Sequence, residues 1–171
     1  MSTPPLPDAP SVDVIEIERA LTRITYLSTR ARRHDRLMAL AGVPLDRAAV
    51  ALLRQVADSE PLRPGELAAR LGVEASHVTR TVQQLQTSGH VTRVPDPDDR
   101  RAQRIQLTEA GGEAIAKIRD AGIRAMRAAL SDWSPGDLRH LATLFHRMVD
   151  DFLAHALDEE GEPRPAPAGE A

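Results

Sequence analysis

The sequence contains no cysteine, a single lysine and only four aromatic residues among 171. Without cysteine the chain has no disulfide, no thiolate zinc site and no iron–sulfur ligands, and it cannot sense oxidants through a thiol. The scarcity of aromatic residues leaves Ala, Leu, Val and Ile to form the core, which favours helices over a large sheet. We therefore expect a mainly α-helical protein.

Other signals of location and chemistry are also missing. No run of about 18 apolar residues and no secretion leader occurs, so we expect a cytoplasmic protein that does not contact a membrane. The sequence also lacks a nucleophile elbow and a phosphate-binding loop, which predicts that the protein is not an enzyme and needs no cofactor. Six histidines are present, but no two have the i, i+3 or i, i+4 spacing of metal ligands on one helical face. A zinc sensor remains the weaker alternative.

The most informative segment spans residues 64–107. Pro64 suits the first turn of a short helix, and Gly72 can take the left-handed conformation that ends this helix and turns the chain. A second helix is predicted from Glu74 or Ala75 to about Ser88, with three apolar residues on its buried face: Val78, Val82 and Leu85. This spacing predicts a helix-turn-helix.

The other face of the second helix is polar and has no acidic residue after Glu74. An ordinary solvated face mixes Glu and Lys, whereas these side chains are able to bond a base edge or a phosphate. We interpret the helix as a DNA recognition helix whose contact residues are Ser76, His77, Thr79, Arg80, Thr81, Gln83 and Gln84.

Two short strands, residues 91–94 and 102–107, enclose the polar turn PDPDDRR. Arg100 and Arg101 lie near the tip of this hairpin, where guanidinium groups can reach a minor groove or flanking phosphates. We interpret Asp99, together with Asp96 and Asp98, as a turn former and an anchor that aims the arginines. The hairpin is the wing of a winged helix-turn-helix.

At this point the sequence resembles a known family. The run DPDDRRAQRIQLTEAG, residues 96–111, is similar to the wing and following helix of MarR-family transcription regulators. Asp99 and Arg101 match the wing motif of that family, and Leu107, Thr108 and Gly111 match its LT..G ending. The positions that match the helix-turn-helix consensus are Leu67, Ala68, Gly72 and Val78. The resemblance implies a dimeric, ligand-responsive DNA-binding repressor or activator.

Long amphipathic helices flank the winged unit. One is predicted from Ser11 to about Leu40, a second from Thr108 to about Leu130, and a third from Pro135 to about residue 157. Their apolar stripes exceed what one small domain can bury, so we expect a twofold dimer. The predicted organisation is a disordered leader (1–10), a helical dimerisation domain (11–40 and 112–157), a winged helix-turn-helix (41–111) and a disordered acidic tail (158–171).

The net charge is −3, but residues 63–107 alone carry +2, so the positive charge lies where DNA is expected to bind. We predict a homodimeric, sequence-specific regulator of a pseudo-palindromic operator, acting as a repressor. The alternatives are a nonspecific architectural DNA-binding protein and a winged helix used for protein partners. The resemblance implies that a small-molecule effector pocket, if present, involves Tyr26, Arg33, His34, Leu37 and Met38. The alternative, with equal weight, is that these residues belong to the dimer core and the protein surface.

Overall fold

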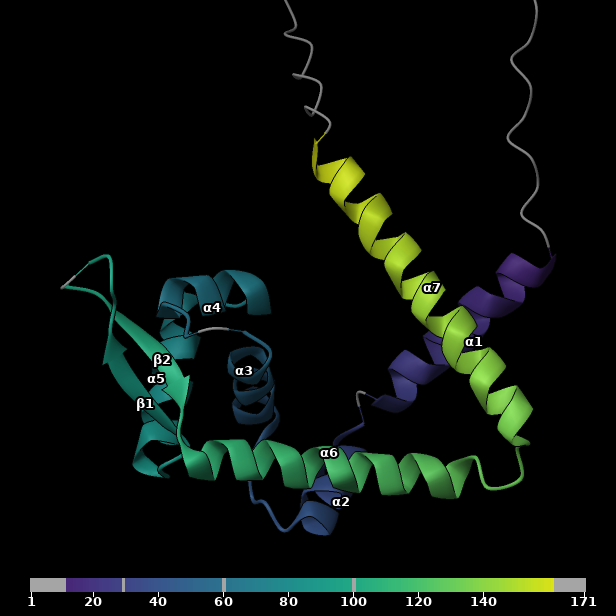
Figure 1. Ribbon diagram of the computed structural model, residues 1–171, viewed down its shortest axis with the longest axis horizontal. Helices are drawn as coiled ribbons and strands as arrows, with labels where there is room; N and C mark the ends of the chain where they lie inside the picture. Colours follow the sequence, from purple (N-terminus) through teal and green to yellow (C-terminus); the bar gives the residue numbers. More distant parts are fainter. Residues whose placement is uncertain (1–11, 29, 60, 100, 162–171) are drawn as a thin grey trace, which may run out of the picture. The chain divides into compact units, whose positions relative to one another are not determined.

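The computed structural model describes residues 12–161 except residues 29, 60 and 100. It contains two antiparallel strands and is otherwise helical (Figure 1), which confirms the predicted fold class. The elements in chain order are α1 (Val12–Ser28), α2 (Ala31–Ala41), α3 (Arg47–Ala57), α4 (Pro64–Leu71), α5 (Ala75–Thr87), β1 (Val91–Pro95), β2 (Gln103–Leu107), α6 (Glu109–Ala129) and α7 (Pro135–Gly161). The predicted leader and residues 162–171 of the predicted tail lie outside the described residues.

The chain divides into two compact units, the first ending at Ala125 and the second beginning at Met126. The hydrophobic core of the first unit is formed by α3, α4, α5 and the hairpin, which Figure 1 shows gathered together. Met38 of α2 and Ala114 and Ile118 of α6 are also part of this core. The winged domain therefore takes core residues from both sides of the predicted range 41–111.

Local signals in the sequence set the ends of the helices. The Asp46 carboxylate accepts a hydrogen bond from the Ala49 N–H (2.8 Å) and caps α3. Gly72 has φ +62°, the left-handed conformation that ends α4. The residue before α4, Arg63, supplies no cap, but Glu66 compensates by accepting from the Arg63 N–H at 2.7 Å.

The wing is a regular two-stranded ladder. Val91 pairs with Leu107 at its base and Pro95 with Gln103 towards its tip. The Ile105 N–H also donates to the Leu62 carbonyl (2.8 Å), which attaches the segment before α4 to β2. The hairpin is thus joined to the helix-turn-helix through its backbone.

Two predicted boundaries were wrong. The single helix predicted to reach Leu40 is two helices, because α1 ends at Ser28 and Arg30 is extended (ψ 128°) before α2 begins. The apolar spacing continues through the break, so periodicity alone gave no sign of it. At the other end, α7 continues to Gly161, beyond the predicted end at residue 157. Residues 158–161 are therefore helical and do not belong to a disordered tail.

None of the helices in the described part of the chain has the length and hydropathy needed to cross a bilayer.

Candidate nucleic-acid interface

The exposed face of α5 is a single polar stripe. Ser76, Thr79, Arg80 and Gln83 occupy positions i, i+3, i+4 and i+7, and all four are exposed. The opposite face anchors the helix in the core through Val78, Val82 and Leu85. Because α5 contains no acidic residue, nothing on this stripe repels a phosphate or a base-edge acceptor.

Two of the predicted contact residues border the stripe. His77 is half-buried, and the Arg80 Nη2 lies 3.4 Å from its Nδ1, where the guanidinium donates to the ring nitrogen. Gln84 is exposed, but its amide nitrogen lies 3.4 Å from the Asp46 carboxylate and donates to it. Arg80 is therefore oriented along the helix, and Gln84 is partly engaged by the N-cap of α3.

Thr81 was wrongly assigned to the exposed face. Its relative exposure is 5%, and its hydroxyl donates to the His77 carbonyl at 3.0 Å. Thr81 follows Val78 by three residues and precedes Leu85 by four, so it lies on the buried side of the helix. The spacing favours burial of Thr81 and its polar hydroxyl favours exposure; burial prevails because the hydroxyl is satisfied by the His77 carbonyl.

Asp96, at the start of the wing turn, is a buried carboxylate with several donors. Its side chain has 0% exposure, and Oδ2 accepts from the Nε atoms of Arg63 and Arg104, both at 2.7 Å. Its Oδ1 accepts from the backbone N–H groups of Asp98 (2.9 Å) and Asp99 (3.2 Å). The hydrogen bond from Arg63, followed by that from Arg104, holds the pKa of Asp96 far below its ordinary value.

The tip of the wing is closed by hydrogen bonds in which Asp99 is the acceptor. Its carboxylate accepts from the Arg101 N–H (3.0 Å), and its carbonyl accepts from the Ala102 N–H (2.9 Å). The Arg101 side chain is exposed and makes no hydrogen bond with the described residues. Arg100, the second arginine predicted at the tip, lies outside the described residues.

Further contacts fix the wing against the helices. Arg93 of β1 donates from Nε to the side-chain oxygen of Gln86 on α5 (3.1 Å), and Arg63 reaches Asp96 from the start of α4. Sequence reasoning missed the roles of Arg63, Arg93 and Arg104. These arginines have no distinguishing motif, and Arg63 and Asp96 are 33 positions apart in the sequence, with no signal of their pairing.

The residues predicted for an effector pocket are only partly brought together. His34 and Met38 line one open hollow of about 760 Å³ between α2 and the start of α3, and the His34 Nε2 lies 2.9 Å from the Leu45 carbonyl oxygen. Leu37 packs against the core instead, and Arg33 is exposed outside the lining. Tyr26, on α1, accepts from Arg30 (3.0 Å) and also lies outside the hollow.

The histidines lie on α2, α5 and α7 and, for His90, between α5 and β1. Within the described ranges, no three His, Cys, Asp or Glu side chains are arranged to hold a metal ion.

The charge state of Asp96 leads to a prediction for stability against pH. Because its pKa is lowered on folding, Asp96 stabilises the protein fully above its unfolded pKa of about 3.8, and this contribution is lost as the pH falls through the folded value. We expect the difference in unfolding free energy between wild type and Asp96→Asn to be constant near neutrality and to shrink below about pH 4. Urea unfolding of both proteins at several pH values and a fixed protein concentration measures this difference. A difference that grows in acid would contradict the assignment, and Asp98→Asn, at an 80% exposed side chain, is the control.

Comparisons with known proteins agree with this geometry. The sequence profile of the MarR family matches residues 43–102, which contain the helix-turn-helix, β1 and the wing turn but not β2. A protein of Thauera aromatica, named as a transcriptional regulatory protein for the hcr operon, is 31% identical over 107 residues. That match covers 61% of this chain, and the chain spans less than two thirds (64%) of the Thauera protein.

Solved structures extend the likeness beyond the winged domain. The transcriptional regulator Tm0710 from Thermotoga maritima is 31% identical with a TM-score of 0.64, over 80% of this chain and 96% of that one. The MepR F27L mutant of S. aureus, solved bound to an oligodeoxyribonucleotide, shares the fold with a TM-score of 0.55 at 14% identity, over 79% of this chain and 97% of that one. The Thauera and Thermotoga proteins are named as regulators and not as enzymes, in agreement with the predicted non-enzymatic role.

Proposed function

Because this chain belongs to the MarR family and is a transcriptional regulator with a DNA-binding winged helix, we propose that it acts as a homodimer on a pseudo-palindromic operator. Two α5 helices related by twofold symmetry contact half-sites about 10 bp apart in successive major grooves. Occupancy of the operator excludes the transcription machinery, so the outcome is repression in the bacterial cytoplasm. A small-molecule effector releases the protein.

The observation that carries this proposal is the acid-free stripe on α5. Its side chains match the groups that distinguish base pairs in the major groove, since Arg pairs with guanine and Gln with adenine. The wing follows α5 in the sequence and contacts it in the structure through Arg93 and Gln86. Arg101 at the tip of the wing is exposed. Ser76, Thr79, Arg80 and Gln83 are the proposed base and phosphate contacts, with Gln84 and His77 at the border.

The dimer is supported by apolar side chains that the single chain leaves exposed. On α7 the exposed residues include Leu144, Phe145, Phe152 and Leu153, with Phe152 58% exposed. On α1 they are Val12, Val14, Ile15, Ile17, Ile24, Tyr26 and Leu27. Such stripes on two helices exceed the scattered apolar residues of an ordinary surface. A second copy of the chain is the partner that covers both by symmetry.

The effector proposal rests on the hollow next to α2. Its floor is apolar, with Met38, Val43 and Leu45, and its rim carries His34 and Asp46. A ligand that binds one arrangement of the dimer better than the other shifts the population able to span both half-sites. Residues 11–40 and 112–157 remain our proposal for the dimerisation domain, with Met38, Ala114 and Ile118 also packing in the core of the winged domain.

The proposal is tested by selecting binders from a random duplex library at about physiological salt and footprinting the recovered DNA. We expect an inverted repeat with half-sites about one helical turn apart. Recovery of bound but unrelated sequences, with similar and steeply salt-dependent affinity, would favour an architectural protein. Recovery of no DNA, in the presence and absence of candidate effectors, would favour a protein-binding role.

Replacing Arg101 with alanine tests the wing. We expect affinity for the selected duplex to fall at least about tenfold, because a dimer loses two contacts to phosphate or the minor groove. Folding should be unaffected, since the side chain is exposed and makes no hydrogen bond with the described residues. Fluorescence anisotropy measures the affinity. The control is Arg119→Ala, at an exposed position on α6, and equal affinities of the two variants would remove Arg101 from the interface.

A further inference from the structure

Asp96 is unusual for a residue at the start of a hairpin turn, because its side chain is fully buried. Carboxylates are seldom buried unless they are paired, and here two guanidinium groups and two backbone N–H groups satisfy both oxygens. Neither the turn nor the strand pairing requires an ion cluster of this kind. Its partners indicate what the cluster holds in place.

In one direction, hydrogen bonds lead from Asp96 to the wing tip. Asp96 Oδ1 fixes the N–H groups of Asp98 and Asp99, and the Asp96 N–H donates to the Ala102 carbonyl (3.1 Å). Asp99 in turn accepts from the Arg101 N–H (3.0 Å). These hydrogen bonds to the Asp96 carboxylate and to Asp99 therefore help to set the backbone from which the Arg101 side chain extends.

In the other direction, the same carboxylate connects the wing to the helix-turn-helix. Arg63 immediately precedes α4, and Arg104 lies on β2. Asp96 Oδ2 accepts a hydrogen bond from each, so this one atom connects the helix-turn-helix to the wing. Charge-assisted hydrogen bonds of 2.7 Å are strong and directional. The separation between the wing tip and α5 is therefore set partly by this carboxylate.

We propose that Asp96 is a positioning residue for DNA binding, which holds the wing so that Arg101 reaches the DNA while α5 occupies the major groove. This inference rests on the proposed function. Asn is the informative replacement, because any amide rotamer that keeps its oxygen towards the turn N–H groups directs its NH₂ towards two guanidinium donors. The clamp, meaning the hydrogen bonds of Asp96 with Arg63, Arg104 and the turn N–H groups, is then lost with little change in side-chain volume.

A double-mutant cycle on the selected duplex tests the proposal, with Asp98→Asn as a matched control that removes the same charge from an 80% exposed side chain of the same turn. We expect Asp96→Asn to weaken binding about as much as Arg101→Ala, at least about tenfold, and Asp98→Asn to change it less than about twofold. In the Asp98→Asn variant, adding Arg101→Ala should weaken DNA binding by the same factor as in the wild-type chain. In the Asp96→Asn variant, the same addition should weaken DNA binding by less than about twofold.

The outcomes separate the inference from its premise. If Arg101→Ala has no effect in the wild-type chain, the proposed wing contact itself is wrong. If Arg101→Ala lowers the DNA affinity of the wild-type chain and of the Asp96→Asn variant by the same factor, Asp96 only supports the fold and the inference is overturned. Should Asp96→Asn not fold, hydrogen exchange in the wild-type chain decides: the amides of Asp98, Asp99 and Arg101 should be protected, and exchange at unprotected rates would overturn the clamp.

Discussion

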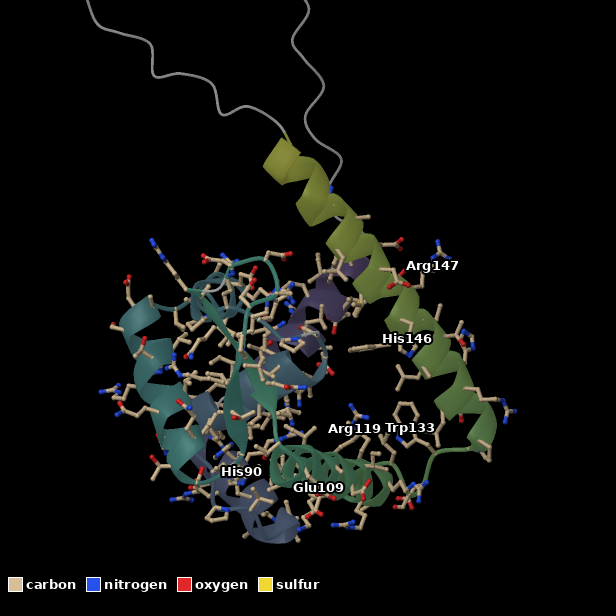
Figure 2. All side chains as sticks on the ribbon, turned by 60° about the vertical axis from the view of Figure 1, so that its left-hand side comes forward. His90, Glu109, Arg119, Trp133, His146 and Arg147 are labelled. Carbon is tan, nitrogen blue, oxygen red and sulfur yellow. The ribbon has the colours of Figure 1, made fainter. Side chains whose placement is uncertain are left out.

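Replacing Gly111 with alanine is expected to lower the free energy of unfolding by about 2–3 kcal/mol. Gly111 lies in the first turn of α6, and a Cβ there would overlap the carbonyl oxygen of His90 and approach Leu107 Cδ2 to 3.2 Å. Figure 2 shows His90 next to this turn, near Glu109. Because the obstacle is backbone, the clash is relieved only by moving α6 away from the connection between α5 and β1.

The loss extends beyond one contact. The His90 carbonyl also accepts from the Thr108 N–H (3.1 Å), and the Thr108 hydroxyl donates to the Gly89 carbonyl and caps α6. Gly112→Ala is the matched control, since nothing lies within 4 Å of a Cβ at that position, and it should stabilise the helix by about 0.5–1 kcal/mol. Urea unfolding followed by circular dichroism, at equal protein concentrations, measures both. Equal stabilities would disprove the close approach.

Replacing Arg80 with alanine is expected to weaken binding to the selected duplex at least about thirtyfold. One bidentate contact to a base is worth about 1–3 kcal/mol, and a twofold dimer loses two of them. Arg80 is exposed at the centre of the α5 stripe, so its removal should leave folding unchanged. Anisotropy titrations at one salt concentration measure the loss, and circular dichroism verifies the fold.

Arg80→Lys shows what Arg80 contacts. Lysine keeps the charge but lacks the planar fork, so it restores a phosphate contact and fails to restore a bidentate base contact. We expect Arg80→Lys to remain at least about tenfold weaker than wild type on the selected duplex and to bind nonspecific DNA as wild type does. Full restoration by lysine would reassign Arg80 to the phosphate backbone. Wild-type affinity of Arg80→Ala would exclude it from the interface.

Sequence signals with a local physical cause predicted the fold well. Pro64 and Gly72 each act through their own backbone or the next turn, and the structure has helix boundaries at both. The break between α1 and α2 was not predictable in this way, because the apolar spacing is the same on both sides. Periodicity reports which face is buried and not whether the helix is continuous.

The candidate site was predictable as a surface but not as a set of contacts. The absence of acids from α5 identified the stripe, whereas the burial of Thr81 required its neighbours in the core to be considered. The Asp96 cluster and the role of Gly111 depend on groups brought together by folding, from Arg63 and His90 respectively. Pairings of this kind have no sequence spacing that identifies them.

The central claim, that two α5 helices of one dimer contact paired half-sites on one side of the DNA, is tested most directly by changing the half-site spacing. Inserting about 5 bp between the half-sites turns one of them to the opposite side of the duplex, whereas inserting about 10 bp restores the side but lengthens the span. We predict that the 5-bp insertion reduces affinity to that of a duplex with one half-site. Undiminished affinity after this insertion would contradict the account.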